Sequence, residues 1–120
     1  MEKVAVIGAS PNPERYANKA MKMLAEYGHT PIPVAPKHEM IENLKVYAAL
    51  DQVEEDLDTV TLYLSPARQE TVIEQILDKK PGRVIFNPDT ENPAAREKLE
   101  NAGITVTEAC TLVLLKTGQF

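Results

Sequence analysis

A glycine followed by two small residues ends the first apolar run of the chain. The run covers residues 3–8 and ends at Gly8. Ala9 and Ser10 follow in a turn, and a helical pattern begins soon after them. Glycine permits a sharp turn, the small alanine lets a ligand approach the backbone, and serine supplies a hydroxyl group. The N–H groups at the start of the following helix can hold phosphate oxygens. These residues therefore predict a site for a phosphorylated ligand.

The rest of this loop differs from the glycine-rich motif of dinucleotide-binding proteins. Residues 10–15 read Ser-Pro-Asn-Pro-Glu-Arg, so the second and third glycines are missing and two prolines are present. The prolines stiffen the loop and remove two N–H donors. Charge and position add Asn12, Arg15 and Lys19 to the expected ligand contacts. A plain strand-to-helix turn is the alternative explanation for Gly8.

A basic loop follows the second apolar run. Folds that bind NAD place Asp or Glu here to hold the ribose hydroxyls, whereas this chain has Ala35, Pro36, Lys37 and His38. An acidic side chain would repel a ribose phosphate and a lysine would attract one. The loop therefore indicates an adenine nucleotide with an extra ribose phosphate, and both NADP and coenzyme A meet that description. An exposed loop lysine without a ligand is the alternative for Lys37.

Few residues offer catalytic chemistry. Cys110 is expected near the first turn of the last helix, where the helix dipole lowers a thiol pKa and a CoA thiol could form a mixed disulfide. Glu108 opposes thiolate formation, and burial as a small apolar side chain explains the cysteine as well. His29 is expected in a surface turn and His38 in an exposed loop. No general base with an oriented nucleophile is visible, so the sequence favours a non-catalytic protein.

The elements that carry these loops alternate between strand and helix. Strands are predicted over 3–8, 30–36, 58–64, 83–87 and 104–107, with a ragged edge strand over 45–50. Helices are predicted up to about residue 27, over 65–80, from Asn92 onward and over 109–116. The alternation predicts one domain over residues 1–120, a Rossmann-like doubly wound α/β fold with about five parallel strands and helices on both faces.

Two strand ends add detail to this expectation. Pro31 and Pro33 lie two residues apart, so both missing N–H groups face the same side, and we expect their strand to pair firmly on one side only. Ligands of such sheets bind beyond the carboxyl ends of the strands. Ser65 and Pro66, at the end of the strand over 58–64, therefore join the candidate site, with Ser65 also expected to cap the next helix.

The charge of the chain disfavours nucleic acid as a partner. The net charge is −5, with six basic and five acidic side chains in residues 1–50 and seven and thirteen in residues 51–120. An anionic ligand therefore meets least repulsion over the N-terminal half. A single cysteine cannot form an internal disulfide, and the first apolar run is too short for a signal peptide or a membrane span. We therefore expect a cytoplasmic protein with no membrane or metal partner.

Several short motifs occur together in residues 3–50. They are Gly-Ala-Ser-x-Asn-Pro at 8–13, Tyr-Gly-His at 27–29, Pro-Val-x-Pro-Lys at 33–37 and Val-Tyr-x-x-Leu at 46–50. With these motifs the chain resembles the small bacterial CoA-binding-domain proteins, whose domain is similar to the CoA-binding part of the succinyl-CoA synthetase α subunit. From residue 51 onward the resemblance lies in layout more than in motif. One Arg replaces an Arg-rich stretch at 64–68, and Glu-Ala-Cys at 108–110 replaces Asp-Arg-Cys.

The resemblance implies a ligand and its contacts. The ligand is coenzyme A or an acyl-CoA, held by a carrier or sensor. The implied contacts are Gly8, Ala9, Ser10 and Lys37 for the phosphates, Ala35 and Pro36 for the adenosine, and Ser65 and Pro66 at the border of the ligand.

Two other functions remain open from the sequence. The first is an NADP-binding, oxidoreductase-like module, which would need a substrate domain that the chain does not supply. The second is a protein-interaction module with a vestigial nucleotide cleft. The apolar residues 111–120 are able to bury a subunit interface, so a homo-oligomer or a partner enzyme that uses acyl-CoA also stays open.

Overall fold

The computed structural model describes residues 1–120 and contains one five-stranded parallel sheet. Its strands are β1 (Lys3–Ile7), β2 (Thr30–Val34), β5 (Thr59–Leu62), β6 (Arg83–Phe86) and β7 (Thr105–Glu108). They lie in the order β2-β1-β5-β6-β7, so the direction of winding reverses between β1 and β5. The predicted Rossmann-like α/β fold is confirmed.

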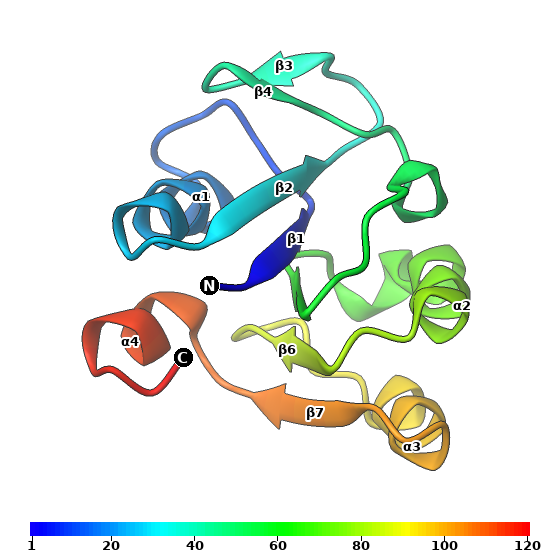
Figure 1. Ribbon diagram of the computed structural model, residues 1–120. Coiled ribbons are helices and arrows are strands. Elements are labelled where there is room, and N and C mark those ends of the chain that lie inside the picture. The colour runs from blue at the N-terminus through cyan, green and yellow to red at the C-terminus, as the bar shows by residue number, and fades with distance from the viewer.

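Helices cover both faces of the sheet (Figure 1). The first face carries α1 (Tyr16–Glu26) and α4 (Thr111–Lys116), and the other carries α2 (Glu70–Lys79) and α3 (Pro93–Asn101). Successive strand side chains point to opposite faces, which is why β1 is apolar along most of its length. The doubly wound arrangement brings the carboxyl ends of all five strands to one edge.

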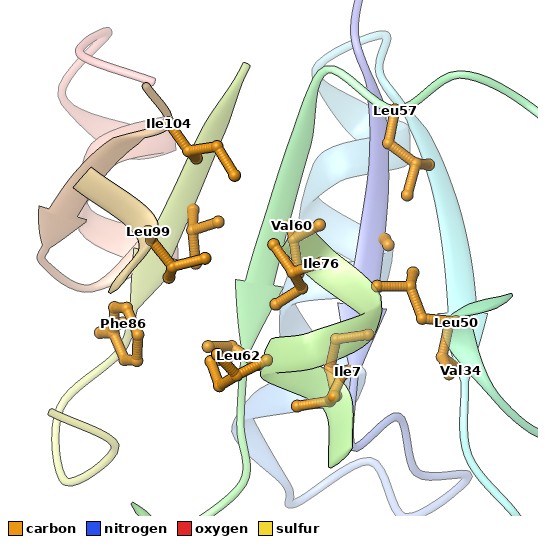
Figure 2. Close-up of a cluster of buried hydrophobic side chains, with 14 of the residues drawn as sticks. Ile7, Val34, Leu50, Leu57, Val60, Leu62, Ile76, Phe86, Leu99 and Ile104 are labelled. Atoms are coloured by element: carbon orange, nitrogen blue, oxygen red, sulfur yellow. The ribbon is translucent and has the colours of Figure 1, made fainter. Parts of the chain in front are cut away.

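The larger part of the core lies between the sheet and helices α2 and α3 (Figure 2). Ile7 and Leu62 of the central strands lie in this cluster with Ile76 of α2 and Leu99 of α3, and all four are at most 3% exposed. Because this layer is closely packed, the central strands and the loops at their ends are held on a rigid base.

Strand β2 is an edge strand, as its prolines predict. It pairs with β1 on one side along its whole length. On the other side it forms a single bridge, in which the Tyr47 N–H donates to the Pro33 carbonyl at 3.0 Å. The nitrogens of Pro31 and Pro33 face this outer side, where a continuous ladder would need N–H donors.

The segment after β2 differs from the predicted edge strand over 45–50. A hairpin forms instead, from β3 (Met40–Ile41) and β4 (Leu44–Lys45), and a 3-10 turn covers Leu50–Gln52. Glu42 and Asn43 make the hairpin turn with positive φ angles of 52° and 65°. Glu42 ties the hairpin to α1 through an ion pair of 3.5 Å with Lys22.

The helix predicted over 65–80 begins later than expected. A 3-10 turn covers Pro66–Arg68, α2 follows from Glu70, and the Ser65 side chain makes no capping hydrogen bond. Gln69 is fully buried between the two helical pieces, and its Nε2 donates to the carbonyls of Leu64 and Thr90, both at 2.8 Å. These two bonds hold the chain in an irregular turn, so the helix cannot extend back to Ser65.

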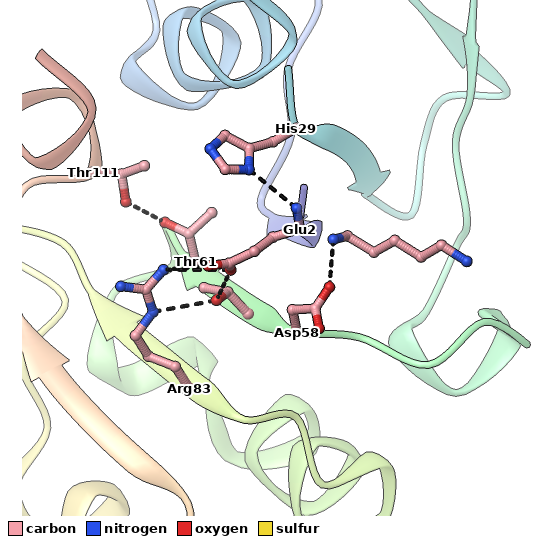
Figure 3. Close-up of polar contacts among 8 residues, drawn as sticks. Glu2, His29, Asp58, Thr61, Arg83 and Thr111 are labelled. Carbon is pink, nitrogen blue, oxygen red and sulfur yellow. Dashed lines mark hydrogen bonds and ion pairs between the residues drawn. The ribbon is translucent and has the colours of Figure 1, made fainter. Parts of the chain in front are cut away.

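Charged residues at the amino end of the sheet neutralise one another (Figure 3). Arg83 pairs with Glu2 at 3.4 Å and donates through Nε to the Thr59 hydroxyl at 3.2 Å. The Glu2 N–H donates to His29 Nδ1 at 3.2 Å, and the His29 ring packs on Phe120 with centroids 4.9 Å apart. His29 is therefore half-buried and held in place at this end of the sheet, in contrast to the surface turn residue expected from the sequence.

Candidate functional site

The loops after β1 and β2 are joined by backbone hydrogen bonds. The N–H groups of Gly8 and Ala9 both donate to the Val34 carbonyl, at 3.0 and 3.3 Å. These two N–H groups are therefore used within the protein. Ala9 and Ala35 are each 6% exposed, so both alanine side chains are buried where the two loops begin.

The loop over residues 10–15 is organised by its own side chains. Ser10 Oγ accepts from the Asn12 N–H at 3.1 Å, and Asn12 Oδ1 accepts from the Glu14 N–H at 3.0 Å. Such side-chain turns occupy the part of the loop where the glycine-rich dinucleotide motif has its second and third glycines. Since Ser10 Oγ is the acceptor in its bond, its hydrogen is free to be donated to a ligand.

The start of helix α1 has donors available for an anion. Arg15 occupies the N-cap position, and no side chain caps the helix. The N–H groups of the first turn therefore have no intrahelical partner. Arg15 and Lys19 are both exposed near this helix start, and neither forms an ion pair with a carboxylate.

A fully buried polar side chain also lies at this helix start. Asn18 Nδ2 donates to the Ser10 carbonyl at 2.9 Å and to Glu42 Oε1 at 3.4 Å, whereas Asn18 Oδ1 has no hydrogen-bond partner. Asn18 connects the first loop to the β3–β4 hairpin. The sequence signal for it was a polar residue on the inward face of the helix, three residues before Met21.

The loop after β2 borders a hollow of about 520 Å³. This volume lies within the range of small-molecule sites. Lys37 and His38 line it from the loop, and Lys45 lines it from β4. The remaining lining residues are Pro36, Glu39, Val46, Ala48 and Gln52. Sequence reasoning missed Lys45, because only the β3–β4 hairpin brings it to the hollow that Lys37 lines.

The loop after β5 approaches the first loop but leads away from the hollow. The Tyr63 N–H donates to the Ile7 carbonyl at 3.0 Å. Ser65 and Pro66 are exposed, and Pro66 lines a separate hollow of about 230 Å³ between α2 and α3. The structure thus joins the loops after β1 and β2 through Gly8, Ala9 and Val34, and it places Ser65 and Pro66 on the far side of the switch point.

A buried polar network lies beneath the ends of β5 and β6. Asn87 donates to the Thr61 hydroxyl at 2.6 Å and accepts from the Thr111 N–H at 2.9 Å, and the two threonine hydroxyls are 2.8 Å apart. The Tyr63 hydroxyl is buried beside them without a hydrogen-bond partner, and burial raises the pKa of Tyr63 to about 12. Cys110, partly exposed, occupies the N-cap position of α4 as expected.

No helix of this chain has the length and apolar character that crossing a membrane requires.

Comparison with solved structures finds the same architecture in other proteins. An uncharacterized protein of known crystal structure is 42% identical, with a TM-score of 0.95, and the match covers 100% of this chain and 98% of that one. A hypothetical protein from Pyrococcus horikoshii OT3 is 32% identical, with a TM-score of 0.92 over 97% and 82% of the two chains.

A larger enzyme contains the fold as one part. Acetyl-coenzyme A synthetase 1 from Ca. Korarchaeum cryptofilum is 19% identical, with a TM-score of 0.78 over 90% of this chain and 25% of that one. At this identity the likeness establishes the shared fold. The family model for the CoA binding domain matches residues 2–116, almost the whole chain. This match, in a fold whose direction of winding reverses between β1 and β5, shows that the chain belongs to the CoA-binding domain family.

Proposed function

We propose that this protein binds coenzyme A or an acyl-CoA across the loops after β1 and β2. The observation that carries the proposal is the hollow lined by Lys37, in a chain of the CoA-binding domain family. The first loop, which is hydrogen-bonded to the end of β2, leads into the uncapped start of α1. Pyrophosphate and ribose phosphate are both anionic, and this edge of the sheet carries cations that no carboxylate neutralises.

The pyrophosphate fits the first loop. The free hydrogen of the Ser10 hydroxyl and the unbonded N–H groups of the first turn of α1 are suitable donors. Arg15 and Lys19 add positive charge beside them, and Asn12 shapes the loop through its own hydrogen bond. Gly8 and Ala9 contribute through the close approach of their backbone, since their N–H groups already bind Val34.

The adenosine and its phosphate fit the second loop. Ala35 and Pro36 would lie along the adenosine, and Lys37 would bind the ribose 3′-phosphate from the wall of the hollow. A carboxylate at this position would favour an unphosphorylated ribose, so the lysine supports a ligand that carries the phosphate. Ser65 and Pro66 would border the other end of the ligand, next to the switch point.

The role we propose is that of a carrier or sensor without catalysis. His29 is engaged at the opposite end of the sheet, so it is not available as a base at the site. Cys110 has no imidazole among its hydrogen-bond partners. The proposal includes a cytoplasmic location, where acyl-CoA enzymes are available as partners.

Calorimetric titration tests the proposal with three ligands. CoA, dephospho-CoA and NADPH are titrated into the wild type and into Lys37→Ala. Lys116→Ala is the control, because Lys116 is an exposed cation at the C-terminal end of α4 and does not line the hollow. We expect CoA to bind more tightly than dephospho-CoA, and Lys37→Ala to reduce that difference. Lys116→Ala should bind as the wild type does.

Three results would contradict this proposal. A preference for NADPH would favour an oxidoreductase-like module, and binding of none of the ligands would favour an interaction module. Equal affinities for CoA and dephospho-CoA would remove the role given to Lys37.

A further inference from the structure

Lysine and arginine side chains divide into two groups in this structure. Lys3, Lys22, Arg83, Arg96 and Lys98 all form ion pairs with glutamates. The other basic side chains form none, and among these only Lys37 and Lys45 line the hollow of about 520 Å³. Two ammonium groups at one hollow without a counterion repel each other, and an anion bound between them would remove that repulsion.

The Lys45 side chain contacts an aromatic ring. Its Nζ lies 4.8 Å from the centroid of the Tyr47 ring, within the range of a cation–π contact. Lys45 and Tyr47 are two residues apart in an extended segment, which places their side chains on the same side. The contact reduces the number of positions that the flexible lysine side chain can occupy.

Tyr47 in turn is attached to the strand end that carries Lys37. The Ala35 N–H donates to the Tyr47 carbonyl at 2.9 Å, and the Tyr47 N–H donates to the Pro33 carbonyl at 3.0 Å. The segment that carries Lys45 is therefore fixed in position relative to the loop that carries Lys37, although the two lysines are eight positions apart in the sequence.

We propose that Lys45 is a second ligand of the ribose 3′-phosphate and, with Lys37, determines the preference of the site for 3′-phosphorylated nucleotides. This assignment rests on the proposed function of CoA binding. The phosphate would lie between an ammonium group from the loop and one from β4, with Tyr47 positioning the second. Tyr47 is thus a positioning residue and does not contact the ligand.

The other charged groups that face the hollow do not change this assignment. Glu39 is the only carboxylate in its lining, and it forms no ion pair with either lysine. His38 also lines the hollow. Lys37 and Lys45 are the two lysines in the lining, and we expect them to supply the positive charge around the phosphate.

The test compares affinities for CoA and dephospho-CoA, measured by calorimetry on a set of variants. Lys45→Gln should weaken CoA binding roughly threefold to tenfold and leave dephospho-CoA binding within about twofold of the wild type. Lys45→Arg keeps the charge and should retain most of the preference. Tyr47→Phe keeps the ring and should behave as the wild type, whereas Tyr47→Leu should reduce the preference. Circular dichroism of each variant verifies the fold.

Each outcome decides the assignment. A lower CoA to dephospho-CoA preference in Lys45→Gln, restored in Lys45→Arg, supports it. An unchanged preference in Lys45→Gln overturns it while leaving the proposed function intact, and so does equal weakening of both ligands, which would indicate general attraction by charge. A wild-type protein that binds neither ligand overturns the proposed function and this assignment with it.

Discussion

Gly8 lies against the carbonyl group of Tyr63, so that a Cβ atom on Gly8 would stand 3.3 Å from the Tyr63 oxygen. The Leu64 side chain would lie at the same distance, and the φ angle of Gly8 is +88°. The first and third strand-end loops therefore meet at the point where the strand order reverses. A side chain at position 8 would disturb both its own backbone and this contact.

Replacing Gly8 by alanine should destabilise the protein more than the same change at Gly103. Gly103 has a similar φ angle of +85°, but a Cβ atom there would meet nothing within 4 Å, so this position isolates the backbone cost. We expect a loss of about 1 kcal/mol for Gly103→Ala and about 2 to 3 kcal/mol for Gly8→Ala, measured by urea unfolding. Equal losses in the two variants would show that the contact with Tyr63 is unimportant.

Asn87 is expected to be essential for stability because it connects three elements. Its side chain bonds the Thr61 hydroxyl, the Leu62 carbonyl and the Thr111 N–H within the buried network. Asn87→Ala leaves these groups without a partner and should cost about 3 kcal/mol in the free energy of unfolding. Asn101→Ala, at an exposed position at the end of α3, is the control and should cost less than about 0.5 kcal/mol. A similar small loss at Asn87 would contradict the prediction.

The stability of the protein should fall in alkaline solution because of Tyr63. Burial raises the pKa of its hydroxyl from 10.0 to about 12 in the folded state. The contribution of Tyr63 to the free energy of unfolding is therefore fully present below about pH 10 and is lost as the pH rises to about 12. The total loss is about 2 to 3 kcal/mol. Urea unfolding at a series of pH values gives the free energy of unfolding of the wild type and of Tyr63→Phe. The loss is measured as the change, with pH, in the difference between these two free energies. Parallel pH profiles would be evidence against it.

The affinity for CoA should decrease as salt is added. The proposed contacts are between phosphates and exposed cations, which salt screens over about 10 Å at 0.1 M. We expect a several-fold weaker Kd at about 0.5 M salt than at about 0.05 M, with a smaller change in Lys37→Ala because one cation has been removed. Titrations at the two salt concentrations make the comparison. An affinity that does not change with salt would mean that apolar contacts dominate binding.

Strand β2 illustrates how much of the fold could be predicted from local chemistry. Pro31 and Pro33 lack the N–H groups that an inner strand needs, and the strand lies at the edge of the sheet. The predicted start of α3 is also correct, since Asn92 accepts from the Ala95 N–H at 3.2 Å and Pro93 follows it. In both cases the chemistry of one or two residues is sufficient.

The hairpin of β3 and β4 could not be predicted in the same way. Its strands have two residues each, too few for an alternating pattern to be recognised. Its position depends on Glu42, which contacts Lys22 and Asn18 of α1. The late start of α2 has a similar cause, because Gln69 bonds a carbonyl of the distant loop at Thr90.

The amino-acid types along the chain were enough to specify alternating strands and helices and an edge strand rich in proline, and they led to the proposal that two loops bind phosphate. Strand and helix preferences depend on neighbours in the chain, so they can be recognised in the sequence. Packing alone placed Lys45 and Lys37 at the same hollow and assembled the buried network around Asn87. Contacts of that kind join residues far apart along the chain, and they exist once the hydrophobic core has brought those segments together.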